Sequence, residues 1–501
     1  MSRSPRFRCG LRSFLIPVTV TAMGIGQLAT ISRSADGQDS PPSLNEAQQT
    51  AVENVDANSD LLCDVNRQIW EFAEVGLKEF QSSALLVEKL KANGFEVEEG
   101  VSGMPTAFVA SYGEGQPIIG ILAEYDALPD LSQKVAAYRE PELEGAAGHA
   151  CGHSGLGTGA LGAVLAVKAA MEKHDLPGTI RLYGTPAEET VIGKVYMVLD
   201  GQFDDLDACL HWHPASQNSA QGGSSKALVS VKFTFKGIPA HASASPESGR
   251  SALDAVELMS VAANYMREHV KEDARIHYVV VNGGGQPNVV PPEATVWYYL
   301  RADTHGDVER NFEWMQDIAR GAALMTRTEM SMQIDTDCHE IIVNTPLTEA
   351  LDANLRALGP TKFSADEHEF ARRLQQPLIE QFGSTFKVSL KEEIETPESS
   401  VSKGSTDVGD ISWKVPTGGL RTVCFPEGSP GHSWQNVASI GSSIGEKGSL
   451  LAAKTLAATA VQLMQEPDLV AAAKSDLERR MENKEYTTLI PEGQPAPKSI
   501  R

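Results

Sequence analysis

The chain has 501 residues, of which 41% are hydrophobic and 22% are charged. A chain of this length is expected to form about two or three domains, and its composition excludes fibrous and intrinsically disordered proteins. The formal net charge of -23 produces a field that repels polyanions. We therefore exclude nucleic acid and anionic membrane surfaces as partners.

The first residues have the features of a secretory signal peptide. An uncharged stretch rich in Leu, Ile, Val, Thr and Ala runs from Ser13 to Ser32, after four arginines: Arg3, Arg6, Arg8 and Arg12. This order predicts a signal peptide over residues 1–34, cleaved after Ser34, and an exported protein, periplasmic or secreted. An uncleaved membrane anchor is the alternative, which four residues within the stretch disfavour: Pro17, Gly24, Gly26 and Gln27. A polar linker is expected over residues 35–60.

Residues 61–225 are predicted to form the first part of a layered α/β catalytic domain. Apolar residues at helical spacing predict a helix from Leu62 to Ala92, ended by Asn93-Gly94. The elements expected next are two strands, a long helix and a strand: Thr106–Ser111, Pro117–Leu122, Leu161–Lys173 and Thr179–Gly184. Strands that alternate with helices are typical of α/β folds.

Residues 226–338 are predicted to form a smaller domain inserted into the first. The order of their elements is β-α-β-β-α-β, over Ala227–Phe235, Ser251–Val270, Ile276–Val281, Ala294–Arg301, Asp307–Met325 and Met330–Asp335. This order matches the ferredoxin-like split βαβ motif. The catalytic domain is expected to resume over residues 339–470, before a C-terminal tail over residues 471–501.

The densest group of potential metal ligands is Gly148-His149-Ala150-Cys151-Gly152-His153, where a loop is expected to enter a helix. Cys151 and His153 are two residues apart, so a turn can aim both side chains into one coordination sphere, at Zn–S and Zn–N distances of about 2.3 and 2.0–2.1 Å. The alternative is a buried cysteine between capping histidines. The six cysteines are too irregularly spaced for a disulfide framework, which favours ligation.

Three further motifs supply ionisable side chains. Glu188 and Glu189 follow the predicted strand Thr179–Gly184, and Leu210-His211-Trp212-His213-Pro214 follows another β-like run, while Gly431-His432-Ser433-Trp434 follows a turn-rich loop. Each motif alone is compatible with a solvated loop. Strand exits of an open α/β sheet are nevertheless where ligands bind, so we expect these side chains to meet. One thiolate, three imidazoles and one carboxylate suit a pair of Zn²⁺ or Mn²⁺ ions rather than Mg²⁺.

The order of the motifs resembles the amidohydrolase branch of the M20 family of metallopeptidases and aminoacylases. The shared motifs are Glu124-Tyr125-Asp126-Ala127-Leu128-Pro129, Gly-His-Ala-Cys-Gly-His, Pro186-Ala187-Glu188-Glu189, Leu-His-Trp-His-Pro, Ala240-His241-Ala242 and Gly-His-Ser-Trp. With the run Lys403-Gly404-Ser405-Thr406-Asp407-Val408-Gly409-Asp410, they look closest to the B-type subunits of aminobenzoyl-glutamate hydrolases. The likeness covers residues 62–465 and includes the inserted domain.

The resemblance assigns roles to individual residues. It implies Glu188 as the general base and five metal ligands: Cys151, His153, Glu189, His211 and His432. It implies that His241, in the inserted domain, serves the active site of a dimer partner, and that Asn288 and Arg301 contact the substrate. Two positions depart from the family pattern, since Ser154 stands where Asp or Asn is usual and Glu124 replaces Asp.

The resemblance also implies an activity. We expect a metal-dependent amidohydrolase, with two Zn or Mn ions as cofactors, that cleaves small N-acyl amino acids with an aromatic acyl group, such as aminobenzoyl-glutamate. A homodimer is expected, with a paralogous subunit as the alternative partner. A dipeptidase or carboxypeptidase of the same fold, or an inactive metal-binding homologue, is the alternative function.

A nucleotide-binding oxidoreductase is a weaker rival. It rests on Gly157-Thr158-Gly159-Ala160-Leu161-Gly162, which matches G-x-G-x-x-G. A dinucleotide site needs a strand directly before these glycines, and here they follow the Cys/His run at a helix start. We expect the glycines to serve close helix packing instead.

Overall fold

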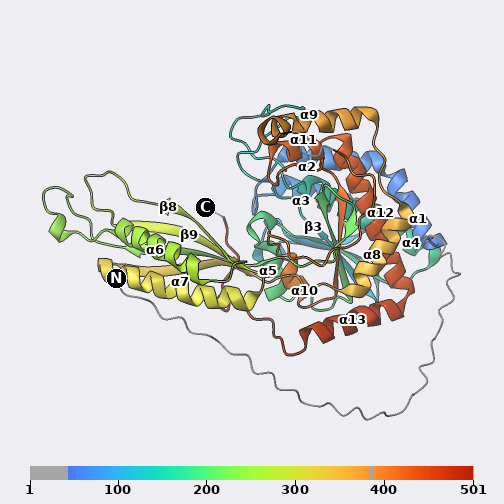
Figure 1. The fold of residues 1–501 in the computed structure, drawn as a ribbon. Helices are drawn as coiled ribbons and strands as arrows, with labels where there is room; N and C mark the ends of the chain where they lie inside the picture. The colour runs from blue at the N-terminus through green and yellow to red at the C-terminus, as the bar shows by residue number, and fades with distance from the viewer. Residues whose placement is uncertain (1–42, 384–388, 500–501) are drawn as a thin grey trace, which may run out of the picture. The chain divides into compact units, whose positions relative to one another are not determined.

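The computed structural model describes residues 43–383 and 389–499, so the predicted signal peptide lies outside the described residues. The catalytic domain is built on a seven-stranded sheet of order β1-β2-β4-β3-β5-β11-β6 (Figure 1). Its strands are β1 (Glu96–Glu99), β2 (Phe108–Glu114), β3 (Ile118–Ala123), β4 (Gly178–Gly184), β5 (Ala208–Ala215), β6 (Ser219–Ala220) and β11 (Thr417–Val423). The four central strands β4, β3, β5 and β11 are parallel, and β1, β2 and β6 pair antiparallel. The predicted α/β catalytic domain is confirmed.

Helices supply the layers that bury this sheet. They are α1 (Glu46–Ala57), α2 (Ser59–Phe72), α3 (Phe80–Ala92), α4 (His153–His174), α5 (Gly193–Leu199), α8 (Thr345–Leu358), α9 (Ala365–Phe382), α10 (Val408–Ser412), α11 (Trp434–Ile440), α12 (Ser443–Gln465) and α13 (Pro467–Met481). α4 and α12 pack against each other and against the central strands, and α1 packs against both helices. Because α4 is held on several sides, its N-terminal residues have fixed positions at the edge of the sheet.

The glycines of α4 allow this close packing. A Cβ atom added to Gly159 would lie 2.8 Å from the Trp212 ring, and one added to Gly157 would lie 2.9 Å from the carbonyl oxygen of Glu124. Both distances are too short for a real side chain, so the G-x-G-x-x-G run is needed for packing. α4 has the length and hydropathy of a membrane span, but 89% of its apolar window is buried inside the protein.

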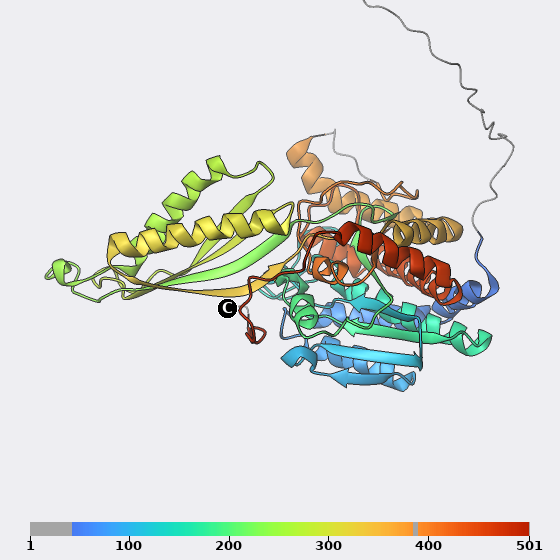
Figure 2. The same cartoon turned by 90° about the horizontal axis from the view of Figure 1, so that it is seen from below.

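The inserted domain has the predicted β-α-β-β-α-β order. Its elements are β7 (Ala227–Lys236), α6 (Ala252–Met266), β8 (Arg275–Asn282), β9 (Glu293–Ala302), α7 (His305–Thr326) and β10 (Glu329–Cys338). The strands form an antiparallel sheet of order β10-β7-β9-β8. Figure 2 shows α6 and α7 on one face of this sheet. Alternate residues of β9 are buried, as expected for a sheet covered on one side.

The linker predicted over residues 35–60 is wrong from Glu46 onward, because α1 begins there. Asn45 and Gln48 form a capping box, in which the Asn45 side chain accepts a hydrogen bond from Gln48 N at 3.0 Å and the Gln48 side chain accepts one from Asn45 N at 2.9 Å. Val52 and Val55, one helical turn apart, are buried. The helix therefore belongs to the catalytic core despite its polar composition.

The single helix predicted over 62–92 is divided into α2 and α3. Ala73 and Leu77 adopt left-handed backbone conformations, with φ of 44° and 64°, which stop the helix. The break brings Glu79 into the interior, where its carboxylate accepts hydrogen bonds from Ala187 N at 2.8 Å and Thr106 Oγ1 at 2.9 Å. The connection therefore supports the loop that carries Glu188 and Glu189.

The tail predicted over residues 471–501 contains ordered structure. α13 continues to Met481. Farther along, the Tyr486 hydroxyl donates to Asp410 Oδ1 at 2.8 Å, and Gln494 Nε2 donates to the carbonyl of Ile334 at 2.8 Å. The last segment is therefore bonded to both the catalytic and the inserted domain.

Candidate metal centre and active site

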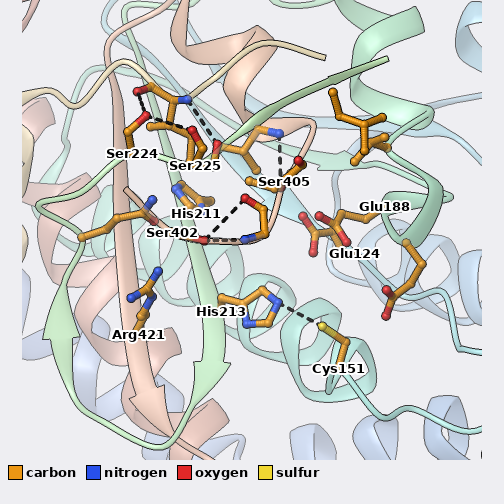
Figure 3. Close-up of a pocket in the computed structure, with 18 of the residues that line it drawn as sticks. Glu124, Cys151, Glu188, His211, His213, Ser224, Ser225, Ser402, Ser405 and Arg421 are labelled. Carbon is orange, nitrogen blue, oxygen red and sulfur yellow. Dashed lines mark hydrogen bonds between the residues drawn. The ribbon is translucent and has the colours of Figure 1, made fainter. Parts of the chain in front are cut away.

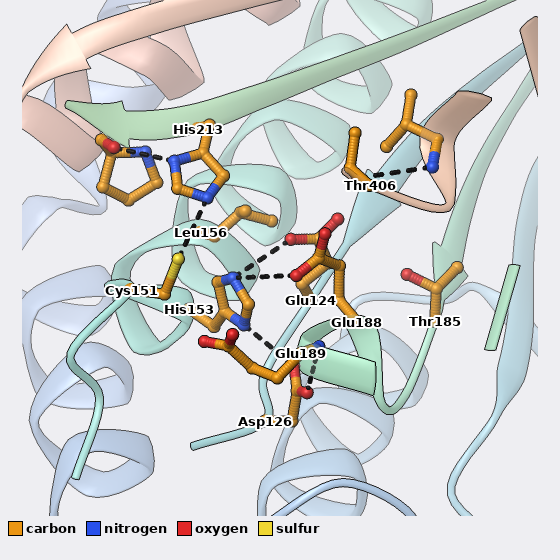
Figure 4. Close-up of polar contacts among 12 residues, drawn as sticks. Glu124, Asp126, Cys151, His153, Leu156, Thr185, Glu188, Glu189, His213 and Thr406 are labelled. Carbon is orange, nitrogen blue, oxygen red and sulfur yellow. Dashed lines mark hydrogen bonds and ion pairs between the residues drawn. The ribbon is translucent and has the colours of Figure 1, made fainter. Parts of the chain in front are cut away.

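The residues of the candidate site come from neighbouring strand exits and from the start of one helix. Glu124 follows β3, Glu188 and Glu189 follow β4, β5 carries His213, and His153 is the first residue of α4. Because β3, β4 and β5 are parallel neighbours, their carboxyl ends meet at one edge of the sheet. Figure 4 shows these side chains converging there.

His153 is fully buried and held by a carboxylate. Its Nδ1 lies 2.8 Å from Asp126 Oδ1, and Asp126 Oδ2 accepts a hydrogen bond from Glu189 N at 2.9 Å. A carboxylate on one ring nitrogen fixes the tautomer and points the other nitrogen at a metal. His153 Nε2 has no hydrogen-bond partner among the described residues, which leaves it available as a ligand.

His213, and not His211, lies with Cys151 and His153. The Cys151 sulfur is 3.4 Å from His213 Nε2, while His213 Nδ1 is 2.7 Å from the carbonyl of Pro214. The ligand atoms of Cys151, His153 and His213 lie within 4.8 Å of one another. His211 points to the same side of β5 but lies two residues, or about 6.6 Å, farther from the strand end. The geometry therefore favours His213 as the ligand, and the role of His211 stays a prediction.

A second group consists of Cys151, Glu189 and His432, whose ligand atoms also lie within 4.8 Å of one another. His432 Nε2 is 3.4 Å from Glu189 Oε2, and Glu189 Oε1 is buried without a hydrogen-bond partner among the described residues. Burial raises the pKa of Glu189 to about 8, and burial together with the Glu189 charge raises the pKa of the Cys151 thiol. Both groups would ionise readily only beside a cation.

Glu188 is buried next to His153 and Glu124. Glu188 Oε2 lies 3.8 Å from His153 Nε2, and Glu124 Oε2 lies 3.3 Å from the same nitrogen. Burial, and then the charge of Glu124, raise the pKa of Glu188 well above its ordinary value. The predicted general base is therefore a carboxyl group in a dry environment, adjacent to the candidate ligands.

A buried lysine forms ion pairs with carboxylates next to Glu188. Lys194, from α5, has no exposed surface, and its Nζ lies 2.8 Å from Glu124 Oε1 and 2.7 Å from Asp407 Oδ1. Lys194 N also donates to Asp407 Oδ2 at 2.9 Å. Although burial alone would raise the pKa of Glu124, the Lys194 ammonium and the nearby imidazoles lower it to about 2. Glu124 is therefore an ionised neighbour of Glu188.

The side chains surround a cavity of about 330 Å³ (Figure 3). His211, Arg301 and Arg421 line it together with Glu188 and four candidate ligands: Cys151, Glu189, His213 and His432. Arg301 Nη1 donates to Ser405 Oγ at 3.0 Å, so β9 of the inserted domain reaches the cavity, and the substrate contact of Arg301 stays a prediction.

Two predicted residues are placed elsewhere. His241 and Asn288 are exposed neighbours in the inserted domain, where Ala242 N donates to the carbonyl of Asn288 at 2.9 Å. Neither residue lines the cavity of its own chain.

Sequence reasoning does not find the roles of Asp126 and Lys194. In Glu124-Tyr125-Asp126, two carboxylates at alternate positions after a strand are a usable signal for a pair that supports metal ligands. Lys194 carries no such signal, because its partners Glu124 and Asp407 are distant in sequence and meet only in the fold.

Comparison with known proteins agrees with this geometry. Residues 120–439 match the peptidase family M20/M25/M40. The B-type subunit of p-aminobenzoyl-glutamate hydrolase from Escherichia coli (strain K12) is 38% identical over 472 residues, which span 89% of this chain and 98% of that protein.

Two solved structures share the fold. An aminobenzoyl-glutamate utilization protein from Klebsiella pneumoniae has a TM-score of 0.56 at 16% identity, covering 82% of this chain and 97% of that one. A dinuclear metal binding peptidase of the M20 family from Bacillus subtilis has a TM-score of 0.53 at 18% identity, covering 82% of this chain and 99% of that one.

Proposed function

Because the chain belongs to the peptidase family M20/M25/M40, whose metal-dependent hydrolases cleave amide bonds, we propose that it hydrolyses small N-acyl amino acids with Glu188 as general base. The observation that carries the proposal is the position of Glu188. Its carboxylate lies in a buried cluster with Glu124 and His153, at the edge of a cavity large enough for a small substrate.

The donor set fits a pair of divalent ions. Cys151, His153 and His213 would hold one ion and Cys151, Glu189 and His432 the other, so Cys151 belongs to both groups. Buried ligand atoms without hydrogen-bond partners among the described residues, His153 Nε2 and Glu189 Oε1, are what a cation would satisfy. Thiolate and imidazole ligands favour Zn²⁺ or Mn²⁺ over Mg²⁺. Bound ions would polarise the amide carbonyl and lower the pKa of water from 15.7 to about 7.

The protein's own residues handle the proton. Glu188 accepts the proton of the attacking water on its carboxylate and then transfers it to the departing amine nitrogen, so one group serves as base and acid. Burial and the charge of Glu124 raise the pKa of Glu188, which is the direction that suits a carboxyl group that first accepts and then donates a proton. Asp126 keeps His153 oriented throughout.

The substrate class follows from the relatives and from Arg301. The relative with 38% identity is named for p-aminobenzoyl-glutamate, and Arg301 offers a guanidinium to a substrate carboxylate. We infer that aromatic N-acyl amino acids of this kind are substrates.

The contrast between two adjacent glutamates tests the proposal. Glu188→Ala is expected to bind metal at the wild-type stoichiometry and to lose turnover, whereas Glu189→Ala loses metal. Metal analysis and hydrolysis of aminobenzoyl-glutamate distinguish the two. Turnover by metal-replete Glu188→Ala would show that Glu188 is not the general base.

We further propose that the inserted domain forms a dimer through β8. This strand is at the edge of its sheet, and Val279, Val280 and Val281 are 53%, 48% and 47% exposed. A two-fold partner would bring His241 to the other chain's active site, with a paralogous subunit as the alternative partner. Mixing inactive His241→Ala with inactive Glu188→Ala is then expected to restore activity. No restoration, or a monomer by light scattering, would contradict the dimer.

Export is also part of the proposal. The N-terminal segment favours removal of residues 1–34. N-terminal sequencing of protein from fractionated cells tests this cleavage, and an intact N-terminus in the cytoplasmic fraction would contradict it.

A further inference from the structure

A side cavity opens beside the candidate metal centre. It has a volume of about 110 Å³ and lies between residues 217–224, which include β6, and residues 398–402. Four residues line both this side cavity and the main cavity: Gln221, Ser224, Ser402 and Arg421. A group bound in the side cavity is therefore continuous with a substrate in the main one, and the volume suffices for a short polar side chain.

Arg421 supplies the only guanidinium among the described residues that line the side cavity. The side chain forms no ion pair or hydrogen bond within the described part of the chain, although the residue is only partly exposed, and burial lowers its pKa. Glu398, exposed at the rim, is the one acidic residue of this lining and lies beyond ion-pair distance of Arg421. Desolvating a cation without a partner is costly, so the side cavity is built for an anion.

The neighbours of Arg421 strengthen this reasoning. Arg421 is the register partner of His213, so its positive charge lies beside a side chain that would hold a divalent ion. Two positive charges at this place would repel each other. An anionic substrate group at Arg421 would offset that repulsion. Polar side chains of Ser219, Gln221, Ser400 and Ser402 complete the lining and can donate hydrogen bonds to such a group.

Arg421 lies close to the candidate metal ligands. Arg421 on β11 is the register partner of His213 on β5, and adjacent strands lie about 4.7–4.9 Å apart. Figure 3 shows Arg421 beside His213. Arg301, on β9 of the inserted domain, also lines the main cavity, where its Nη1 donates to Ser405 Oγ at 3.0 Å. The main cavity is thus lined by two guanidiniums, one from the catalytic domain and one from the inserted domain.

We propose that Arg421 and the side cavity bind the side-chain carboxylate of an acidic amino acid, while Arg301 binds its α-carboxylate. The preferred substrates are then N-acyl derivatives of glutamate or aspartate. This proposal rests on the proposed amide hydrolysis, and it adds the residue that selects the amino acid.

Isosteric substrates test it. The values of kcat/KM for N-benzoyl-glutamate and N-benzoyl-glutamine are measured with metal-loaded wild type, Arg421→Leu and Arg421→Gln. Wild type is expected to prefer the glutamate substrate, and both variants are expected to reduce the glutamate-to-glutamine ratio by about 10–100-fold, as for loss of a charged hydrogen bond. Arg181→Leu is the matched control, because Arg181 is an arginine of the same sheet that pairs with Asp205 away from the cavity.

Binding gives a second readout. In a Glu188→Gln background, which should not turn over, calorimetry with N-benzoyl-glutamate is expected to show weaker binding when Arg421→Gln is added. An unchanged glutamate-to-glutamine ratio of kcat/KM in the Arg421 variants would overturn the Arg421 subsite while leaving amide hydrolysis intact. The same holds if both substrates lose kcat/KM equally and the binding of N-benzoyl-glutamate is unchanged. Absence of turnover on every substrate by metal-replete wild type would instead overturn the proposed function.

Discussion

Replacing Lys194 by methionine tests the buried charge network beside Glu188. Lys194 makes two ion pairs, at 2.8 Å to Glu124 and 2.7 Å to Asp407, and all three side chains are buried. Methionine keeps the volume and removes the charge, which leaves two carboxylates facing each other without a cation. Removing one partner of a buried ion pair costs about 3–5 kcal/mol, so we expect a loss of this size in the free energy of unfolding at pH 8.

The loss is expected to depend on pH in a known direction. Without the ammonium, the folded-state pKa of Glu124 is expected to rise above the unfolded value. The pKa of Asp407, which burial already raises to about 6, is expected to rise further. Stability is then lost as pH rises through the folded pKa and is recovered at lower pH, where the carboxyls are protonated. The variant should therefore be closer to wild type at pH 5 than at pH 8.

Urea unfolding of the metal-free protein at both pH values measures this effect. Lys168→Met is the control, because Lys168 pairs with the exposed Glu172 one helical turn away and such pairs contribute about 0.3–0.5 kcal/mol. A loss below about 1 kcal/mol for Lys194→Met, or an equal loss at both pH values, would refute the network.

Four other substitutions test the ligand assignment, a buried histidine and the packing of α1. His213→Ala is expected to weaken metal binding by more than about 100-fold, whereas His211→Ala is expected to weaken it by about 10–100-fold, as for residues that support the ligands without binding the metal. Competition with a chelator measures both affinities. The reverse order of the two effects would make His211 the ligand. Burial lowers the pKa of His339 to about 4, so the stability that its neutral form contributes is present above pH 6.5 and is lost as pH falls toward 4. His339→Phe is therefore expected to reduce the loss of folding stability below pH 6.5. Parallel pH profiles of urea unfolding for the variant and wild type would contradict this. Val55→Ala is expected to lower the free energy of unfolding by about 1–2 kcal/mol, and no change in urea unfolding would mean that α1 does not pack as described.

Much of the fold is encoded in local patterns. Alternating burial along β9 and the helical spacing of α7 each define an element and the face that it buries, so the inserted domain could be predicted element by element. α1 could not, because its buried face is narrow, and its polar remainder has the composition of a linker. The break at Ala73 could not be predicted either, since Glu79, which anchors the following loop, pairs with residues far along the chain.

The functional site, like the fold, could be predicted only in part. Cys151, His153 and Glu188 lie in dense motifs, and the prediction that they meet agrees with the structure. The choice between His211 and His213 depends on where β5 ends relative to α4, which spacing alone does not determine. The lysine under Glu124 and the guanidinium beside His213 depend on contacts between distant segments, so only the fold reveals them.

Metal-dependent hydrolysis by the purified protein tests the central claim most directly. Metal-stripped protein, with Zn²⁺ or Mn²⁺ restored, is assayed on aminobenzoyl-glutamate, hippurate, an indole-acetyl amino acid and a dipeptide, with metal content measured in the same samples. We expect release of free amino acid only after metal is restored, fastest from the N-acyl glutamate. Stoichiometric metal binding without release from any of the four compounds would contradict the assignment of an amide hydrolase and favour a metal-binding protein that lacks activity.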